Sequence, residues 1–281
     1  MGSMSDAPIK LLVSDVDGTL LDPKKQLTEP VRQAVLRVKQ AGLKFTIVSA
    51  RPPLGTTFLI DALDITEPIA CFNGALTCTP QYEILHQILL AADVATQVAQ
   101  TILEHGLDLW MFRGAEWWVS KLNGPHTEGH IKLMRHEPRY LGEDVTLCAR
   151  ANKLVGVSDD HEAVKRCEKD VIAKCGDRVS ATRSSDYYLD VTDHDANKGN
   201  AVVQLAKLMD IPLENVATIG DMPTDMFMFA KSGMSIAMGN ASDEVKAAAT
   251  FTTTSNAEGG YVKAMDEIVL PRVAQRAGAQ G

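Results

Sequence analysis

Cysteine, positive charge and long apolar runs are all scarce in this chain of 281 residues. The five cysteines are odd in number and none stands in a C-x-x-C pair, which argues against a disulfide framework or structural zinc and predicts buried, reduced thiols. Lysine and arginine number 28 against 36 acidic residues, and a net charge of −8 indicates no surface for nucleic acid or anionic lipid. No run of 18 apolar residues and no basic-then-apolar leader is present, so we expect neither a membrane span nor export, but a cytoplasmic protein.

What the chain does contain is an ordinary globular composition, with 45% hydrophobic and 23% charged residues, at a length that suits one large domain or two modest ones. Short apolar runs at 9–14, 45–48 and 68–72 alternate with a helical pattern between Thr28 and Gly42. This alternation predicts parallel β-α-β units, and each apolar run ends in polar residues. In open α/β sheets, ligands bind at the carboxyl ends of the strands.

The alternation of strand and helix patterns is interrupted near Leu85 and resumes only around Lys198. The intervening stretch predicts adjacent strands that suit an antiparallel sheet with helices on one face. We therefore expect an α/β protein with a parallel-sheet core, residues 8–84 and 189–281, and an inserted α/β domain, residues 85–188. Within the insertion we expect helices at 91–104 and 162–174, a hairpin at 109–119, and strands at 153–157, 178–181 and 187–191.

Side chains that can take part in catalysis or bind a metal follow the predicted strands of the core or start its helices. Asp15 and Asp17 follow the first strand, Ser49 follows the second, Lys198 starts a helix, and Asp221 and Asp225 follow a later strand. Because 183 positions separate Asp15 from Lys198, only the fold can bring these groups together. Acidic residues gathered in this way indicate a divalent, oxygen-ligated cation, and Mg²⁺ is favoured where a phosphate supplies a further ligand.

Four of these stretches, in this order, resemble the motifs of the haloacid dehalogenase superfamily. The first is Asp15–Leu20 (DVDGTL), the second Ser49, the third Lys198 and the fourth Gly220–Asp225 (GDMPTD). Further stretches resemble the Cof-type phosphatases of that superfamily. The resemblance covers nearly the whole chain and implies a Rossmann-like core with a cap inserted after the second motif. The Cof-like stretches are FNGA at 72–75, NKG at 197–199, AMGNA at 237–241 and EGG at 258–260.

The resemblance also implies a role for each carboxylate. Asp15 would be the nucleophile that forms an aspartyl phosphate. Asp17 would protonate the leaving alkoxide and then activate the hydrolytic water. Mg²⁺ would be held by Asp15, the backbone carbonyl of Asp17 and the Asp221 side chain, and would offset the repulsion between a carboxylate and a phosphate. The dehalogenases of the superfamily lack an aspartate at the place of Asp17.

Phosphate binding is implied for a second group of residues. Lys198 would place a positive charge on the transferring oxygens, Ser49 would donate its hydroxyl, and the backbone N–H groups of Val16 and Ala50 would complete the cradle.

The fourth motif departs from the subfamily pattern, because Met222 and Thr224 stand where asparagines are usual. Thr224, at the position that contacts phosphate, keeps a hydroxyl but lacks the two amide donors. Asp225 is expected to support the metal water or Lys198. The departure puts the fine positioning and the rate in question, but not the reaction.

The function that this set of residues predicts is a Mg²⁺-dependent phosphatase for small phosphomonoesters such as sugar phosphates or similar metabolites. Two alternatives stay open at this point. A phosphomutase or phosphotransferase on the same scaffold would pass the phosphoryl group to a hydroxyl, and a non-catalytic protein would only bind a phosphorylated metabolite. The substrate, the cap residues that select it and the oligomeric state have no signature in the sequence.

Overall fold

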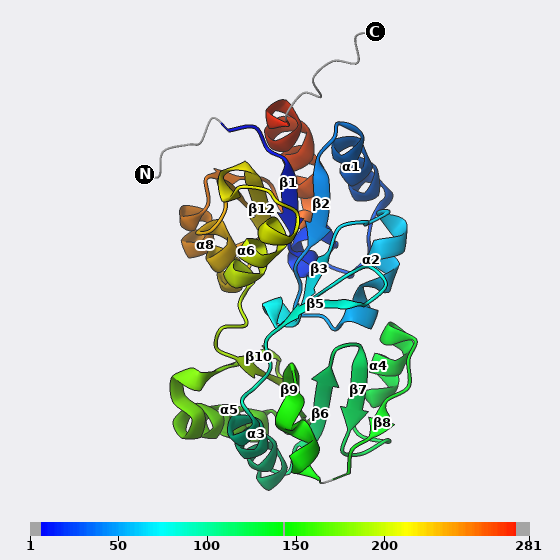
Figure 1. Ribbon diagram of the computed structural model, residues 1–281, viewed down its shortest axis with the longest axis vertical. Coiled ribbons are helices and arrows are strands. Elements are labelled where there is room, and N and C mark those ends of the chain that lie inside the picture. Colours follow the sequence, from blue (N-terminus) through cyan, green and yellow to red (C-terminus); the bar gives the residue numbers. More distant parts are fainter. Residues whose placement is uncertain (1–6, 143, 274–281) are drawn as a thin grey trace. The chain divides into compact units, whose positions relative to one another are not determined.

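The computed structural model describes residues 7–142 and 144–273, which form two compact units. The first unit contains the chain up to Ala50, the segment Thr57–Glu83 and the chain from Asn197 onward. The second unit contains Arg51–Thr56 and Ile84–Ala196. Because the chain leaves the first unit and returns to it, the second unit is an insertion (Figure 1).

The first unit is built on a five-stranded sheet in the order β14-β13-β12-β1-β2, in which every pair is parallel. Apart from Lys44 and the two residues of the edge strand β14, every residue of these strands is buried, as expected for a parallel sheet covered on both faces. All the carboxyl ends therefore meet at one edge. The strands are β1 (Leu11–Ser14), β2 (Lys44–Ile47), β12 (Val216–Gly220), β13 (Met234–Ala237) and β14 (Phe251–Thr252).

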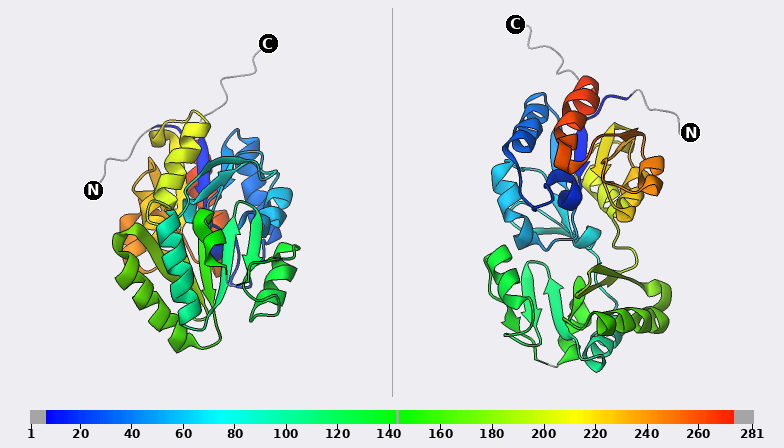
Figure 2. Two further views of the ribbon diagram at one scale, coloured as in Figure 1. Left: turned by 60° about the horizontal axis from the view of Figure 1, so that its bottom comes forward. Right: turned by 180° about the vertical axis from the view of Figure 1, so that it is seen from behind.

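Helices cover this sheet in two groups. Helices α6, α7 and α8 contact one another in sequence and bury apolar side chains against Leu11 and Val13 of β1. Helix α1 contacts α9, and Figure 2 shows it beside the C-terminal helical segment, apart from α6. The helices of the first unit are α1 (Glu29–Gln40), α2 (Thr57–Ala62), α6 (Lys198–Leu208), α7 (Met226–Phe229), α8 (Asp243–Ala248) and α9 (Gly260–Lys263).

A short antiparallel pair in the first unit supports the start of α6. Strands β3 (Ile69–Cys71) and β4 (Leu76–Cys78) are joined by the tight turn Phe72–Gly74, which contacts α6. Gly74 has φ +106°, and a Cβ placed there would lie 2.6 Å from the carbonyl oxygen of Asn197, the N-cap residue of α6. The sequence predicted β3 but not β4.

The second unit holds a six-stranded sheet in the order β10-β11-β9-β6-β7-β8. All neighbours are antiparallel except β7 and β8. Helices α3 and α5 contact each other and share one apolar core with alternate residues of the strands, such as Leu109 and Met111. The strands are β6 (Asp108–Arg113), β7 (Glu116–Val119), β8 (Arg139–Tyr140), β9 (Lys153–Val157), β10 (Val179–Ser185) and β11 (Tyr188–Asp193).

The remaining elements of the second unit are β5 (Ile84–Gln87), α3 (Ala92–Glu104), α4 (Thr127–Met134), α5 (His161–Cys175) and the 3-10 helix η4 (Val145–Arg150). The predicted fold class is confirmed: a parallel-sheet α/β core and a separate antiparallel α/β insertion. The five cysteines are free and buried, as expected.

The boundaries of the units differ from those expected. The expected junction between residues 188 and 189 falls at the start of β11, which pairs with both β9 and β10, so the second unit continues to Ala196. The segment Arg51–Thr56 also belongs to the second unit. Hydrogen bonds between strands decide such a boundary, and they are not visible in a hydrophobic pattern. Among residues 7–142 and 144–273, no helix has the length and apolarity required to cross a bilayer.

Gly74→Ala is expected to destabilise the first unit by about 1–3 kcal/mol, because Ala disfavours positive φ and its Cβ would push against the Asn197 carbonyl. Gly259→Ala is the matched control, since Gly259 has φ +74° but open space around it, so it pays only the conformational cost. Thermal unfolding of the two variants and the parent checks this, and equal losses would show that the close approach at Gly74 is unimportant.

Candidate active site

The loop that follows β1 places Asp15 at the carboxyl edge of the sheet. The backbone N–H of Asp15 donates to the carbonyl of Ile219 on β12, 3.0 Å away, and the side chain is buried. Three residues later, Gly18 adopts φ +86° directly against Asp221, where a Cβ would overlap the carboxylate. Only glycine therefore lets this loop bring Asp15 and Asp221 to the same place.

Lys198, the first residue of α6, is only 4% exposed and sits between two carboxylates. Its Nζ donates to Oδ1 of Asp15 and to Oδ1 of Asp225, each at 2.5 Å. A cation at a helix N-terminus opposes the helix dipole, and burial lowers the pKa of a lysine. The charges of Asp15 and Asp225 outweigh burial and raise the pKa of Lys198 above its ordinary value.

Asp225 is fully buried, and both of its oxygens are used within the protein. Oδ1 accepts from Lys198, and Oδ2 accepts from the backbone N–H groups of Asp221 and Met222, each at 2.8 Å. This carboxylate therefore orients Lys198 and the loop after β12.

Asp221 is held by two side chains that the sequence did not assign to the site. Oδ1 accepts from the Thr19 hydroxyl at 2.8 Å, and Oδ2 accepts from the Asn240 amide at 3.1 Å. Asn240 also donates to the carbonyl of Gly18 at 3.0 Å. Burial raises the pKa of Asp221 to about 6 against the opposing hydrogen bond from Thr19. Both partners lie in stretches that carry the family resemblance, DVDGTL and AMGNA. The sequence therefore pointed to these stretches but assigned no role to the two side chains.

The carboxylates of Asp15, Asp221 and Asp225 have ligand oxygens within 4.8 Å of one another. Three carboxylates with Lys198 leave a net charge of −2 in a buried site (−3 + 1). Burial raises the pKa of Asp15 to about 8, although Lys198 opposes this. Oδ2 of Asp15 is buried and accepts no hydrogen bond within the described part of the chain. A buried carboxylate oxygen without a donor, in a set of hard oxygen ligands two charges short of neutrality, fits a divalent cation.

Ser49 also reaches this edge of the sheet. The N–H of Val48 donates to the carbonyl of Ser14 at 2.9 Å, so Ser49 follows β2 beside the residue that follows β1. Its own backbone is fixed on both sides, because its N–H donates to Ala70 at 3.0 Å and its carbonyl accepts from Asn73 at 2.8 Å. Its side chain is buried.

The other predicted residues lie in the same three loops. Val16 is buried and Asp17 half-buried in the loop after β1, where the charge of Asp17 helps raise the pKa of Asp221. Ala50 is half-buried directly after Ser49. Thr224 is half-buried between Asp221 and Asp225, whereas Met222 is 53% exposed.

Comparison with known proteins agrees with this geometry. A sequence model of haloacid dehalogenase-like hydrolases matches residues 12–265. The chain belongs to this family. The Cof-type resemblance stated from the motifs is thereby confirmed, and the relatives of this hydrolase bear phosphatase names.

YxeH of Bacillus subtilis, provisionally named a phosphatase, is 29% identical over 94% of this chain and 99% of its own length. The Bacillus subtilis 5-amino-6-(5-phospho-D-ribitylamino)uracil phosphatase YwtE is 26% identical over 93% of this chain and 98% of its own. A haloacid dehalogenase-like hydrolase from Bacteroides thetaiotaomicron has the same fold, with a TM-score of 0.81, 25% identity, and coverage of 92% of this chain and 99% of its own. The protein is a phosphatase of this superfamily, a phosphoric monoester hydrolase.

In the metal-free protein, the contribution of Asp15 and Asp221 to stability is expected to fall as pH rises from about 4 to about 8. The folded pKa values of Asp15 and Asp221, about 8 and about 6, exceed the ordinary 3.8, so the folded state keeps protons that the unfolded chain releases in this window. The contribution is complete below the ordinary pKa and is lost as pH rises through the folded values. Thermal unfolding in a chelator measures it.

Asp15→Asn should flatten the part of that profile between about pH 6 and pH 8, because it removes the group with the higher pKa. Asp210→Asn is the control, since Asp210 is exposed in the same unit and its φ of +52° suits asparagine. A parent profile that is level from pH 6 to pH 8, or a variant as steep as the parent, would contradict the charge balance described here.

Asn240→Ala is expected to weaken binding of a divalent cation by about 10–100-fold, because Asp221 loses the amide that orients its Oδ2. Titration with Mg²⁺, followed as the rise in unfolding temperature, gives the affinity. Asn123→Ala, at an exposed position of the second unit, should leave it unchanged. An unchanged affinity in Asn240→Ala would mean that Thr19 alone suffices to orient Asp221.

Proposed function

We propose that the protein hydrolyses small phosphomonoesters in a Mg²⁺-dependent reaction that passes through an aspartyl phosphate on Asp15. The observation that carries this proposal is the state of the Asp15 carboxylate. One oxygen is held by Lys198, while the other is buried and accepts no hydrogen bond within residues 7–142 and 144–273. Lys198 therefore orients this carboxylate through one oxygen, and the other oxygen makes no hydrogen bond within the described residues.

The cation site proposed is made by Asp15, the backbone carbonyl of Asp17 and the Asp221 side chain. Bound there, Mg²⁺ supplies the two positive charges that the buried cluster lacks and orients a phosphoryl oxygen. Thr19 and Asn240 keep Asp221 in place for this task. Asp225 is committed to Lys198 and to two amides, so it acts by positioning rather than as a ligand.

Asp15 attacks phosphorus through its carboxylate, an O–P bond forms, and the bond to the leaving oxygen breaks. Lys198 is the positive charge beside the attacking group and the transferring oxygens, and it reduces the repulsion between them. Because Lys198 is clamped by Asp225, its ammonium is preorganised before the substrate arrives.

Asp17 lies two residues further along the same loop and is half-buried, not fully enclosed. It donates a proton to the leaving alkoxide, which departs as an alcohol. As the resulting carboxylate, Asp17 then takes a proton from water, the water oxygen attacks the aspartyl phosphate, and inorganic phosphate and the Asp15 carboxylate are released. The proton is thereby returned to Asp17 and the cycle is closed.

The remaining donors form the phosphate cradle. The Ser49 hydroxyl, the backbone N–H groups of Val16 and Ala50, and the Thr224 hydroxyl are assigned to the phosphoryl oxygens. The single hydroxyl of Thr224 offers fewer donors than an amide, so we expect a lower rate rather than a different reaction.

The relatives and the two-unit architecture support the substrate class proposed here. One relative is named for a phosphate on a ribityl chain, and the Escherichia coli HMP-PP phosphatase is 24% identical over 85% of this chain and 87% of its own. We propose a small phosphorylated metabolite of this kind, in the cytoplasm, with the first unit as catalytic core and the second unit as the cap that excludes water and selects the substrate.

Asp15→Asn is expected to abolish Mg²⁺-dependent phosphate release from an aryl phosphate and from a panel of metabolite phosphates, a loss of at least about 1,000-fold, because the amide cannot form the covalent intermediate. Asp210→Asn should retain parental activity. Retention of activity in Asp15→Asn would sink the mechanism. Conversion between phosphorylated isomers without phosphate release would favour the phosphomutase alternative.

A further inference from the structure

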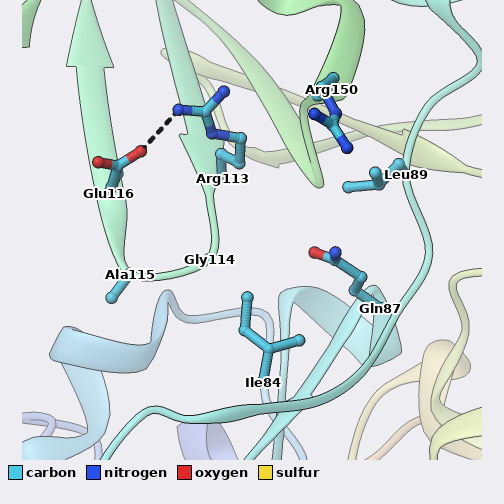
Figure 3. A pocket seen from close by; sticks show the side chains of 8 residues that line it. All are labelled: Ile84, Gln87, Leu89, Arg113, Gly114, Ala115, Glu116 and Arg150. Carbon is cyan, nitrogen blue, oxygen red and sulfur yellow. Dashed lines mark hydrogen bonds and ion pairs between the residues drawn. The ribbon is translucent and has the colours of Figure 1, made fainter.

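The second unit carries a hollow of about 470 Å³ that is lined by none of the residues assigned to the reaction. Its volume falls in the range of roughly 300–1,000 Å³ typical of small-molecule sites. Three segments form its walls: β5 with the residues that follow it, the turn between β6 and β7, and the end of η4 (Figure 3). The lining residues are Ile84, Gln87, Leu89, Arg113, Gly114, Ala115, Glu116 and Arg150.

The walls of the hollow are held in place by Asn152, a fully buried residue. Its Oδ1 accepts from the N–H of Gly114 in the β6–β7 turn at 2.8 Å, and its Nδ2 donates to the carbonyl of Ile88 at 3.1 Å. Its own N–H donates to Phe112 at 2.9 Å. One side chain thus joins the two facing walls, so the hollow is a preformed feature of the unit.

The charge around the hollow is positive, in a chain whose net charge is −8. Glu116 pairs with Arg113 at 2.9 Å and with Arg139 at 2.7 Å, and these hydrogen bonds and charges lower its pKa. Arg150 makes no ion pair with any residue that the structure describes. Two guanidinium groups and one carboxylate therefore line the hollow, an excess of one positive charge (2 − 1).

The shape of the lining complements this charge. In Figure 3 the side chains of Ile84, Gln87 and Leu89 point into the hollow from the segment that begins the second unit, and Arg150 borders the same space. The site thus combines an apolar surface, one amide and guanidinium donors. Guanidinium groups favour carboxylate and phosphate oxygens, which they bind in bidentate geometry.

We propose that this hollow is an effector site for a small organic anion, whose carboxylate or phosphate group binds Arg150 and Arg113 and whose aliphatic body packs on Ile84 and Leu89. The segment Ile84–Leu89 leads directly from the first unit into the second. A ligand that fixes it against the β6–β7 turn restrains a connection between the units, and so alters turnover if domain motion limits the rate. Binding at this site is independent of the proposed reaction, whereas the effector role rests on it.

The test uses the full chain, without Mg²⁺, and two probes that differ in the anionic group: succinate and methylphosphonate. Binding is followed through the backbone amide resonance of Gly114, whose N–H bonds to Asn152 at the hollow. Arg150→Gln should weaken binding of the preferred probe by about tenfold or more. Arg166→Gln, at an exposed arginine on α5, should leave it within about twofold of the parent.

Asp15→Asn should bind the probe as the parent does, which keeps this test separate from the proposed reaction. Which of the two probes binds identifies the anionic group. If neither probe moves the Gly114 resonance, or if Arg150→Gln binds as tightly as the parent, the site is refuted. With Mg²⁺ and an aryl phosphate, the bound probe should change kcat in the parent but not in Arg150→Gln. Binding without any change in kcat would overturn the effector role.

Discussion

The ammonium group of Lys198, held between Asp15 and Asp225, is the interaction on which the rest of the site depends. It links the loop after β1, the start of α6 and the loop after β12, three segments that are distant in sequence. An unpaired lysine at this depth would be costly, and so would the unpaired carboxylates. Each therefore requires the others, and the parallel sheet is the scaffold that brings them to one edge.

The cluster is nonetheless incomplete as a charge system. Lys198 neutralises one of three buried carboxylates, and the raised pKa values of Asp15 and Asp221 show that the protein alone cannot hold them all ionised at neutral pH. The Asp225 carboxylate accepts hydrogen bonds from backbone amides. The uncompensated negative charge therefore lies on Asp15 and Asp221, the two aspartates assigned to the proposed cation. This uncompensated charge lowers the stability of the metal-free protein, and a bound cation would remove the loss.

Most residues of this site could be predicted from the sequence, but the contacts that hold them in place could not. Asp15, Lys198 and Asp221 were identifiable because they end strands or start helices in motifs with fixed order, and the structure brings them together. Thr19 and Asn240 were not assigned, because a hydroxyl and an amide have no chemical signature until their partner, Asp221, is located. The strand β4 was not predicted, because it lacks an apolar run like the one that indicated β3 and is defined by its pairing with β3. The end of the second unit differs from the expected boundary because strand pairing, not composition, sets it.

The hollow of the second unit could not have been found in the sequence for a similar reason. Arg113, Glu116 and Arg150 read as ordinary surface charges, and their meaning depends on which carboxylate pairs with which guanidinium. Net charge is equally uninformative. A chain at −8 holds a cluster with a formal excess of two negative charges in one unit and a hollow with a formal excess of one positive charge in the other. The first needs a cation before it can accept a phosphate, whereas the second attracts an anion directly. The distribution of charge between the units, not its sum, therefore determines which ligands such a protein can bind.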